Sequence, residues 1–222
     1  MLNDDFPHIR GLSGSFLELL PVDGAAVGVR AGPETSQLVH ATDCVVAELD
    51  ELQFTLGEGP CVDTYRRGLP VLVDDLAGAD AFSRWPGFAH EATQAGAAAA
   101  FAFPLQIGAA PFGTVELYRR RPGSLDEGQI ATVLLIVDDM VRVVLDELTG
   151  AGDLQPTANR PVPLFGRVEI PQATGMIAVQ LGVPVAEALA QLRAAAFVQH
   201  RPALDIARDV IARRVTFTPD PR

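Results

Sequence analysis

Lysine is absent from this 222-residue sequence, and only two cysteines, Cys44 and Cys61, occur in it. Two cysteines cannot build a disulfide framework or a cysteine-rich metal site. We therefore expect both to be buried thiols, with a redox or ligand-sensing role as the alternative. No window reaches the roughly 18 uncharged apolar residues of a membrane span, and the acidic N-terminus lacks an apolar signal core. These absences favour a soluble, cytoplasmic protein without a membrane partner.

Signatures of catalysis are also missing. The four histidines, His8, His40, His90 and His200, are scattered, and no two lie at the i, i+4 spacing that places a metal-binding pair on one helix face. No nucleophile elbow, dinucleotide fingerprint or nucleotide-phosphate loop occurs. The paired acids in VDDL and VDDM diverge whether they lie on a strand or a helix. We expect no enzyme activity, no metal and no cofactor.

Charge is distributed unevenly in this acidic chain, whose formal net charge is −11 at pH 7. Residues 1–150 carry 9 Arg against 22 Asp and Glu, whereas residues 164–222 carry 7 Arg against 5 acids. The last quarter is therefore the only part whose charge would tolerate a polyanion. Because a GC-rich genome also favours arginine over lysine, the arginine content alone is weak evidence for phosphate contacts.

A segment rich in proline and glycine divides the chain. Residues 149–166, TGAGDLQPTANRPVPLFG, have no sustained periodicity. Proline removes backbone donors and disfavours helix at the preceding residue, so this composition is typical of a linker. The sequence predicts one domain over 1–150, a linker over 151–165 and a second domain over 166–222.

The segment before the linker alternates between strand and helix patterns. Strands are expected at GAAVGVR, SQLVHATD, LPVLVDDL, AAAAFAFPLQI and APFGTVELYRR. Helices are expected near 43–51, after the GEGP loop, over FSRWPGFAHEATQAG and over 124–150. Ser124 and Glu127 have the spacing of a capping box at the start of the last helix. This order predicts an α+β fold, with an antiparallel sheet of five or six strands and helices on one or both faces.

Three stretches of this segment resemble the GAF domain in order and spacing: LGEGPCVDTYRRGLPVLVDDL, RWPGF and AFAFPLQIGAAPFGTVELYRRRPGSLDEGQ. The resemblance covers about residues 10–148 and is strongest to the version common in actinobacterial regulators. It implies a module that senses a small molecule or dimerises, with a pocket between the sheet and its covering helices. The candidate pocket residues by position are Glu58, Cys61, Trp85, Phe88, Phe103 and Glu116. A plain core role for these side chains, in a domain that only dimerises, is the alternative.

Three short helices are expected after the linker. The first is predicted from about 166 to 181, and Gly182 ends it. The second begins near Pro184, and Pro202 ends it or opens the next turn. Small residues such as Ala173, Ala188 and Ala207 would let the helices approach closely. The predicted core includes Leu192, Ala196, Leu204, Ala207, Val210 and Ile211.

The motifs QATGM, EALAQLRAAA and LDIARDVI keep the spacing of the ANTAR domain, and residues 166–215 resemble it. The resemblance implies a three-helix module of transcription antiterminators that binds RNA hairpins. Carried over by position, the RNA-binding candidates are Arg167, Gln172, Thr174, Gly175, Arg193, His200 and Arg201. Thr174 stands where the family usually has lysine, and Ala194 and Ala195 where a basic residue and an aromatic commonly follow. Since one stacked base is worth roughly 1–3 kcal/mol, these departures lower the expected affinity for RNA.

The sequence therefore predicts a signal-responsive transcription regulator, homodimeric, with an RNA hairpin and an unidentified small molecule as partners. The alternative is a divergent GAF-ANTAR protein that has lost RNA binding and acts as a dimeric interaction or sensor module. DNA binding is a weaker third hypothesis, because the nearest candidate for a recognition helix, RDVIARR, carries its arginines late.

Overall fold

The core of the molecule is one antiparallel sheet. A computed structural model describes residues 6–32, 35–149 and 168–218. Its five strands lie in the order β2-β1-β5-β4-β3, and all neighbouring pairs are antiparallel. The strands are β1 (Gly24–Gly32), β2 (Thr35–Ala41), β3 (Val71–Val73), β4 (Ala99–Ile107) and β5 (Ala110–Arg119). The sequence predicted an α+β fold with an antiparallel sheet of five or six strands; this fold is confirmed, and the sheet has five strands.

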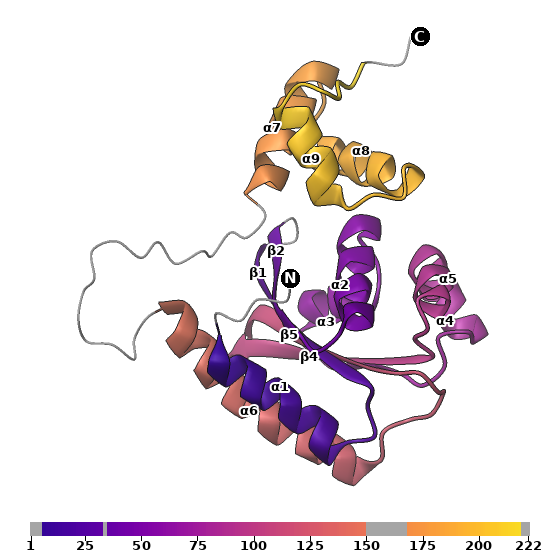
Figure 1. Cartoon of the computed structure of the whole chain (residues 1–222), viewed down its shortest axis with the longest axis vertical. Coiled ribbons are helices and arrows are strands. Elements are labelled where there is room, and N and C mark those ends of the chain that lie inside the picture. The colour runs from indigo at the N-terminus through magenta and orange to yellow at the C-terminus, as the bar shows by residue number, and fades with distance from the viewer. Residues whose placement is uncertain (1–5, 33–34, 150–167, 219–222) are drawn as a thin grey trace.

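Helices α1 (Pro7–Leu19) and α6 (Glu127–Thr149) lie side by side on one face of the sheet (Figure 1). Because side chains alternate between the faces of a strand, every second residue points toward this pair. Phe101 of β4 and Val115 of β5 pack there against Phe16 and Met140 of the two helices. The sequence patterns described above did not predict α1.

The other face is covered by four helices (Figure 1). They are α2 (Cys44–Leu56), α3 (Pro60–Arg67), α4 (Ala79–Arg84) and α5 (Pro86–Gln94). Leu49 and Phe88 pack in this second core against Tyr118 of β5. The sheet is therefore buried on both faces.

Two local predictions were wrong. The helix expected over FSRWPGFAHEATQAG is two helices, because Pro86 disfavours helical backbone at Trp85, whose φ of −141° and ψ of 72° break the run. The capping box of α6 is formed by Asp126 and Gln129, which each accept a hydrogen bond from the other's backbone N–H at 2.8 and 3.0 Å. The helix begins at Glu127 accordingly, rather than after Ser124.

The C-terminal bundle consists of α7 (Glu169–Leu181), α8 (Val185–Val198) and α9 (Ala203–Ile211). Gly182 ends α7 in the left-handed conformation, as expected. Leu192, Ala196, Ala207 and Val210 are fully buried in the bundle's own core, which confirms this part of the predicted core. The linker predicted at 151–165 lies outside the described residues.

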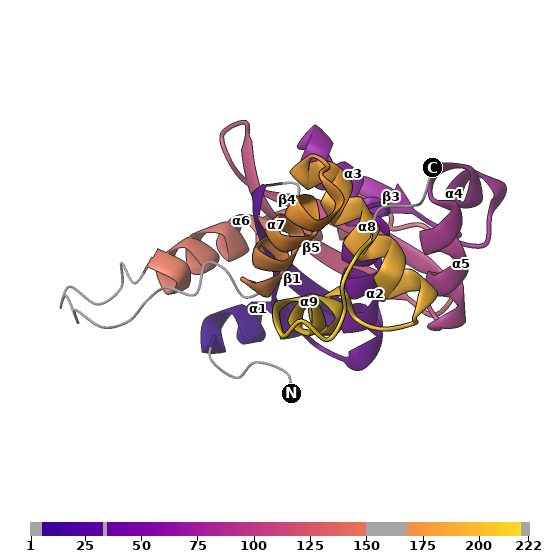
Figure 2. The same ribbon diagram turned by 90° about the horizontal axis from the view of Figure 1, so that it is seen from above.

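The bundle packs against the sheet domain through α2. Helices α2 and α8 are in contact, and Figure 2 shows the bundle lying over α2 and α3. Phe54 of α2 is 1% exposed and belongs to the bundle's core rather than to the core beneath α2. One helix of the sheet domain thus completes the packing of the C-terminal unit.

Within the described part of the chain, no single helix is long and apolar enough to cross a membrane. Helices α7 and α8 have the length and composition of a span only when taken together, and a bend of 105° lies between them. Both contribute buried side chains to the bundle's core.

Candidate functional site

A buried polar cluster joins the sheet to the two helices that cover it. Glu116 faces α2 because its neighbours Val115 and Leu117 face α1 and α6. The side-chain amide of Gln53 on α2 donates to Glu116 Oε1 at 2.8 Å. The backbone N–H of Cys61 on α3 donates to Gln53 Oε1 at 2.7 Å. Gln53 therefore connects β5, α2 and α3 in one buried hydrogen-bonded chain.

The loop between α2 and α3 fits closely around Gln53. Gly59 has a φ of 129°, and a Cβ added there would lie 2.5 Å from Gln53 Cγ. Only glycine satisfies both the backbone angle and the close approach. This gives the GEGP sequence a packing role, which places Cys61 at the first turn of α3.

Burial sets the protonation of the cluster. Desolvation, followed by the nearby Asp50 carboxylate, raises the pKa of Glu116 to about 8, against opposing effects of Cys61, Gln53 and Arg30. Glu116 therefore carries a proton in most molecules at neutral pH. Its Oε2 is buried and has no hydrogen-bond partner among the described residues. With Oε1 accepting from Gln53, the proton lies on Oε2, so this hydroxyl is the unsatisfied polar group that a ligand acceptor or a water would complete.

The two cysteines differ in their surroundings. Burial, then the Glu116 carboxyl, raises the pKa of Cys61 well above its ordinary value. Cys61 is therefore a thiol rather than a reactive thiolate at neutral pH. Cys44 is exposed at the start of α2, so the expectation that both cysteines are buried was wrong for Cys44.

Glu58, Trp85 and Phe88 lie beside one another at the start of α5. Glu58 Oε1 accepts the backbone N–H groups of Gly87 and Phe88, each at 2.8 Å, and so caps the helix. Trp85 and Phe88 are buried and meet edge to face, with ring centroids 6.5 Å apart. The Arg84 guanidinium stacks 4.0 Å from the Trp85 ring. These contacts fix the position of α5.

The structure thus brings Cys61 and Glu116 together and places the other pocket candidates elsewhere. Phe103 packs on the opposite face of the sheet, in the core with α1 and α6. Sequence reasoning missed Gln53, Asp50 and Arg30. Gln53 follows the fully buried Leu49 by one helical turn. A polar residue at that spacing on an apolar stripe was the available signal for a buried polar site.

The RNA-binding candidates of α7 have different environments. Gln172 is exposed and Gly175 is half-buried. Thr174 is 2% exposed, and its hydroxyl donates to the Ile170 carbonyl at 2.7 Å. The side chain of Thr174 is therefore part of the bundle's interior and is not presented to a ligand. Arg167 lies outside the described residues.

The candidates of α8 and its following loop are engaged in contacts within the chain. Arg193 is half-buried, with its guanidinium carbon 5.1 Å from the centre of the Phe54 ring. Arg201 forms an ion pair with Asp209 at 2.8 Å, and both side chains are partly buried. His200 is exposed and has a φ of 49°. Arg193 and Arg201 thus contact other residues of the chain, whereas the His200 side chain is exposed to solvent.

A groove of about 250 Å³ separates the bundle from α2 and α5. Glu48, Glu51, Leu52 and Thr55 of α2 line one wall, and Ala196, Phe197, His200, Arg201 and Pro202 line the other. At its edge, Glu51 Oε1 accepts the backbone N–H of Ala203 at 3.1 Å. No group of three or more His, Cys, Asp or Glu side chains that could hold a metal ion occurs in the described ranges.

The sheet order, the helices on both faces and the buried polar site between β5 and α2 define an α+β domain whose sheet is enclosed by two layers of helices. A family model of the GAF domain matches residues 12–145, more than half of the chain. The chain belongs to the GAF domain family, and the resemblance to this family is confirmed.

Solved structures share this fold. One is a domain of a protein assigned as a two-component sensor histidine kinase from Sinorhizobium meliloti, with 18% identity, 69% of this chain and 99% of that chain covered, and a TM-score of 0.53. Another is a GAF domain in its photoproduct state from Synechocystis, with 16% identity, 67% and 98% coverage, and a TM-score of 0.51. A third is the GAF domain of a phosphoenolpyruvate-protein phosphotransferase from Coxiella burnetii, with 14% identity, 64% and 86% coverage, and a TM-score of 0.50. At these identities the likeness extends to the fold alone. No curated protein matches the chain.

Proposed function

We propose that this protein is a signal-responsive regulator of transcription. The GAF domain senses a small molecule or mediates formation of a homodimer, and the C-terminal bundle binds structured RNA hairpins as an ANTAR domain for antitermination. The observation that carries the proposal is the double role of α2. Gln53 of this helix holds the buried polar cluster, and the next residue, Phe54, packs in the core of the bundle.

This arrangement supports transmission of a signal without any chemical step. A ligand that completes Glu116 Oε2 would change the hydrogen bonds of Gln53 and hence the position of α2. Because Phe54 and Glu51 on α2 contact the bundle, a shift of α2 changes the packing of α8 and α9 against the sheet domain. A ligand biases such an equilibrium by its differential affinity for the two positions. The protein requires no catalytic residue for this role.

The RNA-binding half of the proposal depends on release of the bundle. Arg193 lies against Phe54 in the docked arrangement, and phosphate contacts need an accessible cation. Arg208 and Arg214 on the bundle are more than half exposed and pair with acidic neighbours at its surface. Undocking would add Arg193 to the cations available for RNA. The docked form is thus the form with weaker RNA binding.

A second candidate function follows from the use of Thr174 and Arg193 in internal packing. If these positions serve only stability, the bundle is an interaction module that stays on the GAF domain and binds no RNA. The same fold then acts as a dimeric sensor or scaffold. The two candidates differ in one measurable property, which is saturable binding of RNA.

The test is binding of the full chain to hairpin RNAs while salt is varied between about 50 and 200 mM. We expect saturable binding that weakens as salt rises. Arg193→Gln should weaken this binding, because it removes a cation that contacts phosphate once the bundle is released. The matched control is Arg142→Gln on α6, which removes an exposed arginine paired with Asp139 outside the bundle. Absence of saturable binding at low salt, with the oligomeric state unchanged, would establish the second candidate instead.

A further inference from the structure

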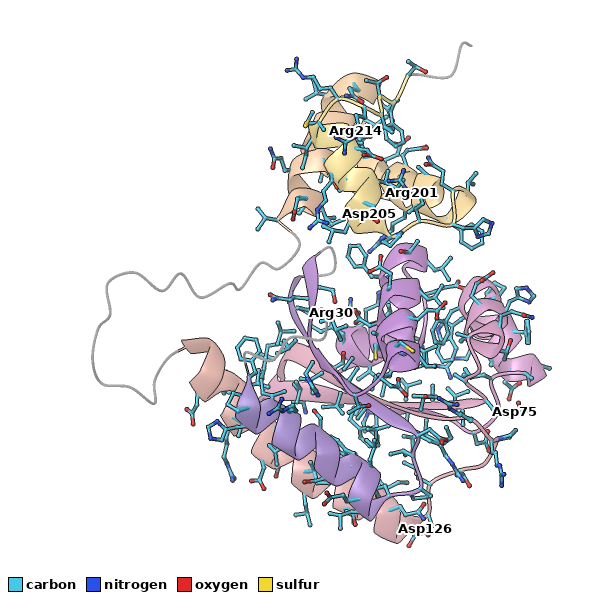
Figure 3. All side chains as sticks on the ribbon, in the orientation of Figure 1. Arg30, Asp75, Asp126, Arg201, Asp205 and Arg214 are labelled. Atoms are coloured by element: carbon cyan, nitrogen blue, oxygen red, sulfur yellow. The ribbon has the colours of Figure 1, made fainter. Side chains whose placement is uncertain are left out.

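A small pocket lies where the bundle meets the sheet domain. Its lining includes Arg30, Gly57, Val62, Tyr65, Arg66 and Arg193, and its volume is about 20 Å³. The three arginines come from β1, α3 and α8, so they are far apart in the sequence. Figure 3 shows Arg30 on the strand pair directly below the bundle.

Among the residues that the structure describes, the pocket is lined by three arginines and by no acidic side chain. This is unusual in a chain whose net charge is −11. Like charges that converge repel one another, and the repulsion is stronger where solvent is excluded. An anion between the three guanidinium groups would remove this repulsion and unite the elements that carry them.

Arg30 supplies an observation independent of the clustering. It is only 8% exposed, and its guanidinium carbon lies 5.6 Å from the centre of the Tyr65 ring. Its Nη2 is buried and has no hydrogen-bond partner within the described part of the chain. A buried, charged donor without an acceptor is unfavourable, so the geometry favours an acceptor from outside the chain.

Neither of the two nearby buried carboxyl groups, Glu116 and Asp50, accepts a hydrogen bond from Arg30 Nη2. Glu116 is mostly protonated at neutral pH, because its pKa is about 8. The Asp50 carboxylate is directed at β1 beside Gly28, where its Oδ1 lies 3.6 Å from the position of an added Cβ. Neither Glu116 nor Asp50 belongs to the described lining of the pocket.

Arg193 approaches the pocket closely because residue 57 is glycine. Gly57 has a φ of 69°, and a Cβ added there would lie 3.1 Å from Arg193 Nη1. The left-handed backbone and the missing side chain therefore leave room for the guanidinium at the end of α2.

We propose that this pocket is a binding site for one oxyanion group, a carboxylate or a phosphoryl group of a small molecule, held by Arg30, Arg66 and Arg193. The volume admits about one water-sized group. One oxygen of the anion therefore enters beside Arg30, and the remainder lies at the mouth beside the exposed Arg66. Because Arg193 belongs to α8, the bound anion fastens the bundle to the GAF domain. This site goes beyond the function proposed above and requires neither RNA nor a ligand at Glu116.

The test uses the full chain with two probes, inorganic phosphate and acetate, titrated calorimetrically at constant ionic strength with chloride as the background anion. We expect saturable binding of at least one probe, and the tighter of the two identifies the source of the oxyanion. Arg66→Gln and Arg193→Gln should each weaken binding about tenfold, since each removes a charge-assisted hydrogen bond. Arg30→Gln should weaken it at least as much. Bound anion should also slow amide hydrogen exchange in α8.

The matched control is Arg208→Gln, which removes an arginine from the bundle outside the pocket and should leave anion binding unchanged. Arg66 is exposed, so its replacement tests the site without disturbing buried packing. If R208Q and R66Q weakened anion binding equally, the net charge of the chain would explain the binding, and the proposal would be overturned. Absence of saturable binding of both probes to the unmodified chain would overturn it as well.

Discussion

The carboxylate of Glu51 on α2 accepts a hydrogen bond from the backbone N–H of Ala203, the first residue of α9, at 3.1 Å. The first N–H groups of a helix have no partner within the helix. A carboxylate at this position also interacts favourably with the helix dipole. A residue of the sheet domain therefore caps a helix of the bundle, 152 positions away in the sequence.

Removal of this cap should loosen α9 specifically. Glu51→Ala leaves the N–H of Ala203 without its acceptor, and the loss of a cap costs about 0.5–2 kcal/mol. We expect amide hydrogen exchange in α9 to become several-fold faster, with little change in β4 and β5. The control is Glu48→Ala, an exposed carboxylate one turn earlier on α2. Unchanged protection in E51A, or an equal loss in E48A, would show that the contact contributes no stability.

Phe54 should be more important for the bundle than for the domain to which it belongs in sequence. Phe54→Ala removes a buried ring from the bundle's core, a change that typically costs about 3–5 kcal/mol. We expect hydrogen exchange to rise more in α7, α8 and α9 than in the sheet. Phe88→Ala, a ring of equal size in the core under α5, should show the opposite distribution. Identical profiles for F54A and F88A would contradict the assignment of Phe54 to the bundle.

The stability of the protein should depend on pH through Glu116. Its pKa is about 8 in the folded chain and near 4.5 when the carboxyl is exposed. Between these values the folded state holds a proton that the unfolded state has released. The free energy of unfolding therefore falls as pH rises through this window, by at most about 1.4 kcal/mol per pH unit from this group.

Glu116→Gln should remove this slope. Urea denaturation between about pH 6 and pH 8 should show the variant gaining stability relative to the unmodified chain as pH rises. The amide oxygen of the introduced glutamine can still accept from Gln53, so the packing is preserved. Parallel pH profiles for the two proteins would mean that Glu116 titrates as an ordinary exposed carboxyl.

The two thiols should react at very different rates. Cys44 is exposed at the start of α2, whereas Cys61 is 2% exposed and burial raises its pKa. Because the thiolate is the reactive species, we expect alkylation of the folded chain to be at least about tenfold faster at Cys44. Peptide mass spectrometry after timed alkylation measures both sites, and the unfolded chain serves as the control with similar rates. Fast modification of Cys61 in the folded chain would indicate that α3 opens readily.

Local patterns were sufficient to predict the sheet. Strands β4 and β5 are apolar segments joined by a short turn, and their pairing places Phe101 opposite Leu117. The break at Trp85 follows from Pro86 alone and was available from the sequence. The capping box was misplaced because Ser124 and Asp126 are both good N-cap residues, and only the hydrogen bond between Asp126 and Gln129 distinguishes them.

The site was less accessible to sequence reasoning, because it depends on contacts between distant segments. Glu116 and Cys61 were expected near each other, but Gln53, which joins them, has no distinctive motif. Phe103 was assigned to the same pocket although its place in β4 directs it to the other face. Arg193 was expected at an RNA-binding surface, whereas its contact with Phe54 appears only when the bundle is packed on α2.

The position of Arg193 over Phe54 has a consequence for any competing partner. Because both residues belong to one chain, each meets the other at an effective concentration on the order of millimolar rather than at the concentration of the protein. A partner that binds this face of α8 must displace an internal competitor, so its apparent dissociation constant rises by the inverse of the undocked fraction. Covalent linkage thus makes the docking of the bundle stronger than the same contacts would be between separate molecules.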